Sequence, residues 1–191
     1  MSLPRNALIY GENDPSDHLY KIVRGTVRTC KMLIDGRRQI GAFYFPGDTF
    51  GVEAGYRHGF SAEAVGDVKV LAIKRKDVAC PAEWGRETSG DLWTLLAQEL
   101  KRAQDHALLL CMNAQERVAG FLLDMAERGH AGPEVDLPMS RQDIADYLGL
   151  TIETVSRVLT QFESRSAIAL TTSRRIALRS PAALKRMRAR R

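Results

Sequence analysis

The segment SRQDIADYLGLTIETVSRVLTQFE, residues 140–163, constrains the fold more than any other part of the sequence. Ser140, followed three residues later by Asp143, forms a capping box, because each side chain can bond the other residue's backbone N–H. Gly149 stands where a first helix must end, since glycine tolerates the left-handed conformation that reverses the chain. Thr151 is a natural cap for a second helix. The segment therefore predicts two short helices joined by a tight turn.

The apolar positions of this segment follow helical spacing. They recur at i, i+3, i+4 intervals as Ile144, Ala145 and Leu148 in the first helix and Val155, Val158, Leu159 and Phe162 in the second. The small Ala145 lets the two helices approach, and the branched Val155 fills the angle between them. This spacing is typical of a helix-turn-helix, which places its second helix in the major groove of DNA. Any hairpin of two helices also needs a small contact and a turn glycine, so the motif alone leaves both interpretations open.

Positive charge is concentrated around this motif. Residues 139–191 hold eleven Lys and Arg against four Asp and Glu, a net charge of +7, whereas residues 1–138 carry −2. A basic segment around a helix pair is expected where that segment meets phosphate. The alternative is a solvated basic tail, which the last seven residues, KRMRARR, would fit. Without those seven residues the segment is still positive.

Strand patterns occupy the beginning of the chain and return near its end. Residues 6–77 contain short β-type runs with glycine-rich turns, as in QIGAFYFPGDTFG, which predicts an antiparallel barrel or jelly roll. After the helix pair, SAIALTTSRRIALRSP holds two short β runs around a polar turn, which predicts a wing with Arg174 and Arg175 at its tip. These arginines can meet a phosphate backbone, although a charged hairpin tip is just as often only solvated. Pro181 then begins a short last helix.

A long apolar stripe links the two halves of the sequence. Between Thr88 and Cys111 apolar side chains recur at near-heptad spacing, as Leu92, Leu95, Leu96, Leu100, Ala103, Ala107 and Leu110. The stripe could pack on the chain's own barrel, but its length and spacing favour a coiled coil of two copies. We therefore predict a homodimer whose interface contains Leu92, Leu96, Ala103, Ala107 and Leu110. A second amphipathic helix follows in NAQERVAGFLLDMAERG.

Composition argues against several classes of protein. No apolar run approaches the length of a membrane span, and the start MSLPRNALIYGEND lacks the apolar core of a secretory signal, so we predict a cytoplasmic protein without membrane contact. The three cysteines and four histidines are scattered, with no CxxC and no His-x-His spacing, so neither a disulfide framework nor a metal site is indicated. A cupin-like metalloenzyme would need such clusters, and we predict no enzymatic activity and no cofactor.

Taken in order, these elements resemble the CRP/FNR family of bacterial transcription regulators. HLYKIVRGTVR resembles the family's first hairpin, FPGDTFG its mid-barrel turn and NAQERVAGFLLDMAERG the helix that joins its halves, so the resemblance covers almost the whole chain. ETVSR, residues 153–157, is similar to the E-x-x-S-R signature of the FNR and FixK branches, and LPMSRQDIADYLGLT before it is most similar to the FixK type. We therefore predict an α+β chain of three parts. These are an antiparallel β-barrel (jelly roll) over residues 1–86, a dimerisation helix with a connecting helix over 87–129, and a winged helix-turn-helix over 130–191.

The resemblance implies a homodimer that binds a palindromic, TTGA-like site on double-stranded DNA and activates transcription by touching RNA polymerase. Members that bind cyclic AMP carry an Arg-Ser pair for the cyclic phosphate, whereas this chain has Phe60 before Ser61, although Glu53 remains. Members that sense oxygen carry an N-terminal cysteine cluster, and here no cysteine precedes Cys30. We therefore predict a barrel that has lost its effector. A regulator that is still gated by a nucleotide or another ligand is the alternative.

Side chains at the start of the second helix are predicted to contact base edges. Arginine suits the two acceptors of guanine, a carboxylate suits the amino donor of cytosine, and an apolar side chain can contact the thymine methyl. The predicted base contacts are Ile152, Glu153, Ser156 and Arg157. The predicted contacts to the DNA backbone are Ser140, Arg141, Thr151, Thr154, Arg174 and Arg175. For Glu153 and Arg157, four residues apart, the alternative is an ion pair on a solvated helix.

Overall fold

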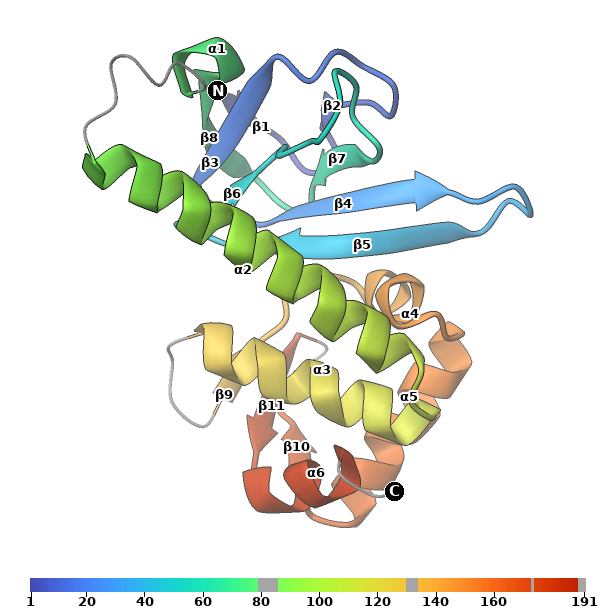
Figure 1. Cartoon of the computed structure of the whole chain (residues 1–191). Helices are drawn as coiled ribbons and strands as arrows, with labels where there is room; N and C mark the ends of the chain where they lie inside the picture. The colour runs from blue at the N-terminus through green and yellow to red at the C-terminus, as the bar shows by residue number, and fades with distance from the viewer. Residues whose placement is uncertain (79–85, 130–133, 173, 189–191) are drawn as a thin grey trace. The chain divides into compact units, whose positions relative to one another are not determined.

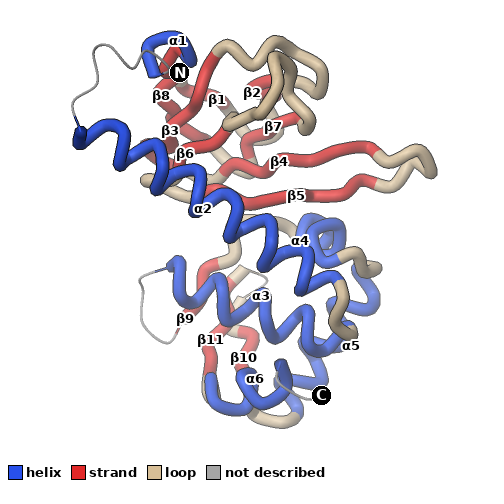
Figure 2. Tube along the Cα trace, viewed as in Figure 1, coloured by secondary structure: helices blue, strands red, loops and turns tan. Residues whose placement is uncertain are grey.

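The computed structural model describes residues 1–78, 86–129, 134–172 and 174–188. The chain divides into two compact units, Met1–Asp105 and His106–Arg191. Figure 2 shows that strands make up most of the first unit before its long helix, whereas helices make up most of the second. The division into three parts, with boundaries at residues 86 and 129, stays a prediction.

Two four-stranded antiparallel sheets form the β-domain of the first unit, before α2 (Figure 1). One sheet has the order β1-β8-β3-β6, with strands Ser2–Leu3, Val68–Lys74, His18–Arg24 and Thr49–Phe50. The other has the order β2-β7-β4-β5, with strands Leu8–Tyr10, Ser61–Ala64, Val27–Met32 and Arg38–Tyr44. A short helix, α1 (Arg75–Val78), follows β8. The glycine-punctuated β runs thus fold as the predicted jelly-roll class of domain.

Aromatic rings fill the space between the two sheets. Phe50 is fully buried, and the centroid of its ring lies 5.3 Å from that of Tyr44, 5.4 Å from that of Tyr20 and 6.1 Å from that of Tyr10. Small and branched side chains from both sheets complete the core around these rings: Ile22, Val27, Ala42, Ala62, Ala64, Val68 and Val70. The alternating inward positions of the strands therefore build one continuous apolar interior.

The turn between β5 and β6, in the segment FPGD, is held by its own hydrogen bonds. Gly47 has φ +94°, a left-handed conformation that favours glycine. The Asp48 carboxylate accepts a hydrogen bond from the Phe45 N–H at 2.9 Å, and the Asp48 carbonyl accepts one from the Ile22 N–H at 2.9 Å. The Asp48 side chain is therefore fixed in place by the backbone around it.

The long predicted helix is present as α2 (Arg86–Leu110). Over its described side chains it has two different faces. Leu92, Leu95, Glu99 and Arg102 are partly buried, while Leu96 and Leu100 are 41% and 60% exposed and Ala103 and Ala107 are exposed as well.

Four helices and a small sheet form the described part of the second unit after α2. The helices are α3 (Ala114–Gly129), α4 (Arg141–Leu148), α5 (Ile152–Ser164) and α6 (Pro181–Arg188). The sheet has the order β10-β11-β9, with strands Ile168–Leu170, Arg175–Leu178 and Glu134–Asp136. β10 and β11 are the two strands of the predicted wing. β9 was not predicted, because three residues are too few to show an alternating pattern.

The apolar faces expected from helical spacing are buried in this unit. On α3 they include Val118, Phe121, Leu122 and Met125, and on α5 Val155, Val158, Leu159 and Phe162. Val135 from β9 and Ile176 from β11 are register partners and are buried as well. The unit therefore has its own core of packed helices covered by the wing sheet.

The predicted turn between α4 and α5 has the geometry that its sequence indicates. The Ser140 hydroxyl accepts from the Asp143 N–H, and the Asp143 carboxylate accepts from the Ser140 N–H, both at 3.0 Å. Gly149 ends α4 with φ +61°, and the Thr151 hydroxyl caps α5 by accepting from the Thr154 N–H at 3.2 Å. The capping box, the left-handed glycine and the second cap are confirmed.

Arg117 of α3 adds a contact to this turn that the spacing did not indicate. Its Nη1 donates to the Leu148 carbonyl at 2.8 Å and to the Gly149 carbonyl at 3.4 Å. These carbonyls close the last turn of α4, where a helix lacks internal donors. The guanidinium therefore fixes the turn to α3.

We predict that Gly149→Ala lowers the free energy of unfolding by about 1–2 kcal/mol, because an L-residue is disfavoured in the left-handed conformation. The new Cβ would also lie 3.4 Å from Nη1 of Arg117. The control is Gly129→Ala, since Gly129 lies at the end of α3 with open space around its Cβ position and no left-handed φ. Urea unfolding followed by circular dichroism measures both variants. An equal effect of the two substitutions would contradict the role of the turn.

Candidate DNA-binding surface

α5 presents a polar face on the side away from its buried residues. Glu153, Ser156 and Arg157 are exposed, and Ile152 is partly buried at the first position of the helix. The four predicted base-contacting residues thus lie together on the first two turns of α5. This is the end of a second helix whose side chains reach base edges in helix-turn-helix proteins.

The charges on this face are set locally. Hydrogen bonding from its own backbone N–H, together with the Thr151 side chain, lowers the pKa of Glu153, so its carboxylate is ionised at neutral pH. Among the described side chains, no ion pair joins Glu153 to Arg157. The face therefore offers an acceptor-only carboxylate and a guanidinium with five donors, one helical turn apart.

Arg141, at the first position of α4, has a buried side-chain donor. Its Nη1 is buried, and within the described part of the chain it makes no hydrogen bond. Burial also lowers the pKa of this guanidinium. A buried N–H without an acceptor is costly, and an anion bound from outside the chain would satisfy it.

The other predicted backbone contacts lie at helix starts and on the wing. Ser140 and Thr151 are the caps of α4 and α5, and the Thr154 hydroxyl lies 3.1 Å from the Thr151 hydroxyl. Arg174 and Arg175 are exposed at the wing turn, where their backbone N–H groups donate to the Thr172 hydroxyl at 3.2 and 3.0 Å.

His106, at the end of α2, contacts α4 and was not singled out by its sequence pattern. Its ring stacks on that of Tyr147, with centroids 4.1 Å apart and an angle of 4° between the planes. Its Nε2 lies 2.8 Å from the Tyr147 carbonyl, and burial lowers the pKa of the imidazole. The two residues are 41 positions apart, so no local signal could have joined them.

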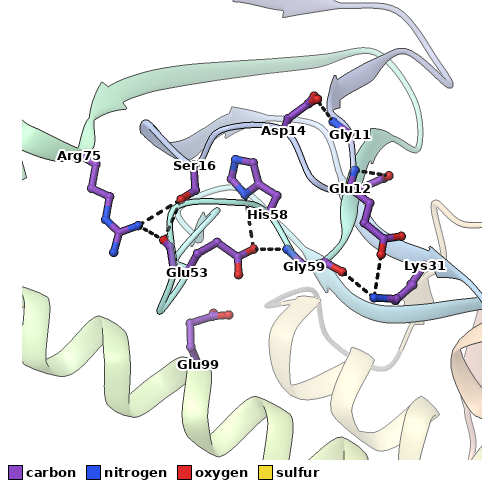
Figure 3. A network of polar contacts seen from close by, with 12 residues as sticks. Gly11, Glu12, Asp14, Ser16, Lys31, Glu53, His58, Gly59, Arg75 and Glu99 are labelled. Atoms are coloured by element: carbon purple, nitrogen blue, oxygen red, sulfur yellow. Dashed lines mark hydrogen bonds and ion pairs between the residues drawn. The ribbon is translucent and has the colours of Figure 1, made fainter.

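In the first unit, Glu53 and Phe60, which the resemblance linked to an effector site, contact other residues of the same domain. Oε1 of Glu53 accepts from the Gly59 N–H at 3.2 Å and lies 3.4 Å from Nδ1 of His58 (Figure 3). The His58 ring is buried and stacks on Tyr10, with centroids 3.5 Å apart. The ring of Phe60 lies beside Gly41 of β5. Glu53 therefore already has partners from its own domain.

The part of the chain that the structure describes has neither a cluster that could hold a metal ion nor a helix that could span a membrane. In this part no group of three or more His, Cys, Asp or Glu side chains is placed to hold a metal ion. None of its helices combines the length and the apolar character needed to cross a membrane.

Two family models match the chain. Residues 1–79 match the cyclic nucleotide-binding domain, and residues 116–187 match the Crp-like helix-turn-helix domain. The first match covers β1 to β8 and α1, and the second extends from α3 into α6.

Individual relatives match over nearly the whole chain. The nitrogen fixation regulation protein FixK of Azorhizobium caulinodans is 50% identical over 189 residues, which cover 96% of this chain and 76% of that protein. FixK of Rhizobium meliloti is 45% identical over 178 residues, which cover 93% of this chain and 81% of that protein. The solved structure of FixK2 from Bradyrhizobium japonicum is similar with a TM-score of 0.94 and 44% identity, over 100% of this chain and 97% of that one.

The fold has a jelly-roll domain followed by a winged helix-turn-helix. The family models and the relatives indicate the same family of proteins. The chain therefore belongs to the CRP/FNR family of bacterial transcription regulators, in its FixK branch, and is a DNA-binding regulator of transcription rather than an enzyme.

Proposed function

We propose that this chain is a homodimeric transcription activator that binds a palindromic operator with TTGA-like half-sites and needs no small-molecule effector. The observation that carries the proposal is the exposed polar face at the start of α5, where Glu153, Ser156 and Arg157 lie together with Ile152. Its relatives are named as regulators of nitrogen fixation. A regulator of this kind acts on the chromosome, in the cytoplasm.

Base recognition is assigned to this face of α5. The Arg157 guanidinium can donate to both major-groove acceptors of guanine, and the ionised Glu153 can accept from the amino group of cytosine. Ile152 can contact a thymine methyl, and the Ser156 hydroxyl can donate or accept. An ion pair between the exposed Glu153 and Arg157 would stabilise the helix less than a bidentate guanine contact would stabilise the complex with DNA.

Phosphate contacts are assigned to the residues around this face. Ser140, Thr151 and Thr154 lie at helix starts, where backbone N–H groups and the helix dipole favour an anion. A phosphate oxygen would satisfy the buried Nη1 of Arg141. Arg174 and Arg175 on the wing would add contacts that fix the register but carry no sequence information.

Effector independence is supported by the interior of the first unit. Phe50 and its tyrosine neighbours occupy the space between the sheets, and Glu53 is engaged by His58 and Gly59. Phe60 stands where cyclic-AMP-binding members carry an arginine for the phosphate. A ligand-gated regulator is the second candidate, and the match of residues 1–79 to the cyclic nucleotide-binding domain favours it.

Dimerisation is assigned to α2. Leu96, Ala103 and Ala107 are exposed, and Leu92 and Leu110 are partly buried, so a second copy could cover this stripe. Two copies would place two α5 helices on two half-sites about one helical turn apart. We assign RNA polymerase as the further partner because the family activates transcription by touching it.

We predict that Arg157→Ala loses about 1–3 kcal/mol of discrimination at one guanine of each half-site, because a bidentate contact is removed. Competition binding with single-base operator variants measures the loss. Arg174→Ala is the control, since it should weaken all sequences alike and reduce the salt dependence by about one phosphate contact. An Arg157→Ala protein that keeps its full preference for guanine would contradict the proposed function.

We predict that Leu96→Glu combined with Ala103→Glu raises the dissociation constant of the dimer about a hundredfold or more, because each carboxylate would be buried without a partner. Gln98→Glu is the control, since Gln98 is exposed and lies about 200° around α2 from Leu96. Sedimentation over a range of concentrations measures all three proteins. A double variant that remains as dimeric as the control would contradict the assignment of the stripe.

A further inference from the structure

α2 is joined to the β-sheets of the first unit by a cluster of polar side chains. The Tyr44 hydroxyl donates to Oε2 of Glu99 at 3.0 Å. Nη2 of Arg102 lies 3.3 Å from Oδ1 of Asp48, and the same guanidinium pairs with the Glu99 carboxylate. Cζ of Arg102 also lies 4.7 Å from the centroid of the Tyr44 ring, a cation–π distance.

The two partners on the sheet side are each held by contacts within the β-sheet domain. Asp48 is held by the Phe45 N–H within the FPGD turn. Tyr44 is buried against Phe50, and burial raises the pKa of its hydroxyl, which therefore stays protonated and can donate. Side chains with fixed positions can define the position of a third group much better than mobile surface charges do.

The cluster lies on a different face of α2 from the exposed stripe. Glu99 and Arg102 are partly buried, with 24% and 21% of their side chains exposed, whereas Leu96, Leu100 and Ala103 are exposed. Each residue adds about 100° of rotation to an α-helix. A shift of one residue in the contact between α2 and the sheets would therefore rotate the apolar stripe by about 100° around the helix axis. The polar contacts thus oppose rotation of α2 about its own axis.

We propose that Tyr44, Asp48, Glu99 and Arg102 form a polar latch that sets the rotation of α2 and holds its apolar stripe outward for a second copy, in the absence of any ligand. These four are positioning residues: they act on DNA binding through the dimer. The inference rests on the proposed function, because it explains how a dimer helix is oriented when no effector does so.

The latch lies beside the segment that the resemblance linked to an effector. Figure 3 shows Glu99 extending from α2 on the side of the helix that faces the Glu53 segment. Burial raises the pKa of the Tyr10 hydroxyl most, and Tyr44, Glu53, Tyr20 and Glu99 raise it further, in that order. Beside the Glu53 segment, α2 is thus joined to the sheets by side chains of the chain itself.

The test uses the full-length chain with Arg102→Ala and, separately, Tyr44→Phe, which keeps the ring in the core. Lys101→Ala is the control, because Lys101 is exposed and pairs with the exposed Asp105 on the same helix. Three quantities are measured well below the melting temperature. They are amide hydrogen exchange along residues 92–105, the dissociation constant of the dimer, and operator affinity without additives.

Arg102→Ala should speed amide exchange in α2 and weaken both dimer and operator binding about tenfold, a coupling typical of conformational control. Tyr44→Phe should shift all three quantities in the same direction but less. Arg102→Lys, which keeps the positive charge, should recover part of the loss. Lys101→Ala should match the wild type.

Two results would overturn the latch. One is an Arg102→Ala protein with wild-type dimer and operator affinity, whatever its melting temperature. The other is equal loss in Arg102→Ala and Lys101→Ala. Failure of the wild type itself to bind the operator without an additive would instead contradict the proposed effector independence.

Discussion

The packing of Phe50 against Tyr10, Tyr20 and Tyr44 is the interaction on which the first unit depends. These rings join the two sheets into one core, since Phe50 comes from one sheet and Tyr44 from the other. They also fill the space between the two sheets. At its edge the same cluster orients Tyr44 toward Glu99 of α2. The same aromatic side chains thus join the two sheets and contact α2 through Tyr44. In the proposed function, this arrangement makes an effector unnecessary and orients the dimer helix.

The second unit uses its core to present a polar surface. The apolar faces of α3 and α5 are buried, so the opposite face of α5 is left to Glu153, Ser156 and Arg157. Arg117 ties the end of α4 to α3, and His106 stacks on Tyr147 of α4. The turn that sets the angle between the two helices is therefore held both by its own glycine and by side chains from outside it.

Sequence could predict the features that local chemistry decides. The capping box at Ser140, the left-handed Gly149, the strand class of the first half and the apolar faces of α3 and α5 each depend on residues a few positions apart. β9 was missed because it is a strand of only three residues. The contact of Arg117 with Leu148 and the pairing of Arg102 with Asp48 join residues that are 31 or more positions apart in the sequence. No spacing rule reaches such pairs, because the fold and not the sequence brings them together. For the candidate surface, sequence predicted which side chains share a face. It did not predict that Arg141 has a buried donor with no acceptor among the described residues.

Effector independence is tested most directly by titrating a fluorescent palindromic operator with the purified wild-type chain, with and without cyclic AMP and cyclic GMP. A protein whose β-domain is filled by its own aromatic side chains should bind the operator with the same dissociation constant in all three conditions. Calorimetry with the nucleotides alone should then show no binding heat. Operator binding that appears only with a nucleotide, or becomes clearly tighter when one is added, would contradict effector-independent DNA binding.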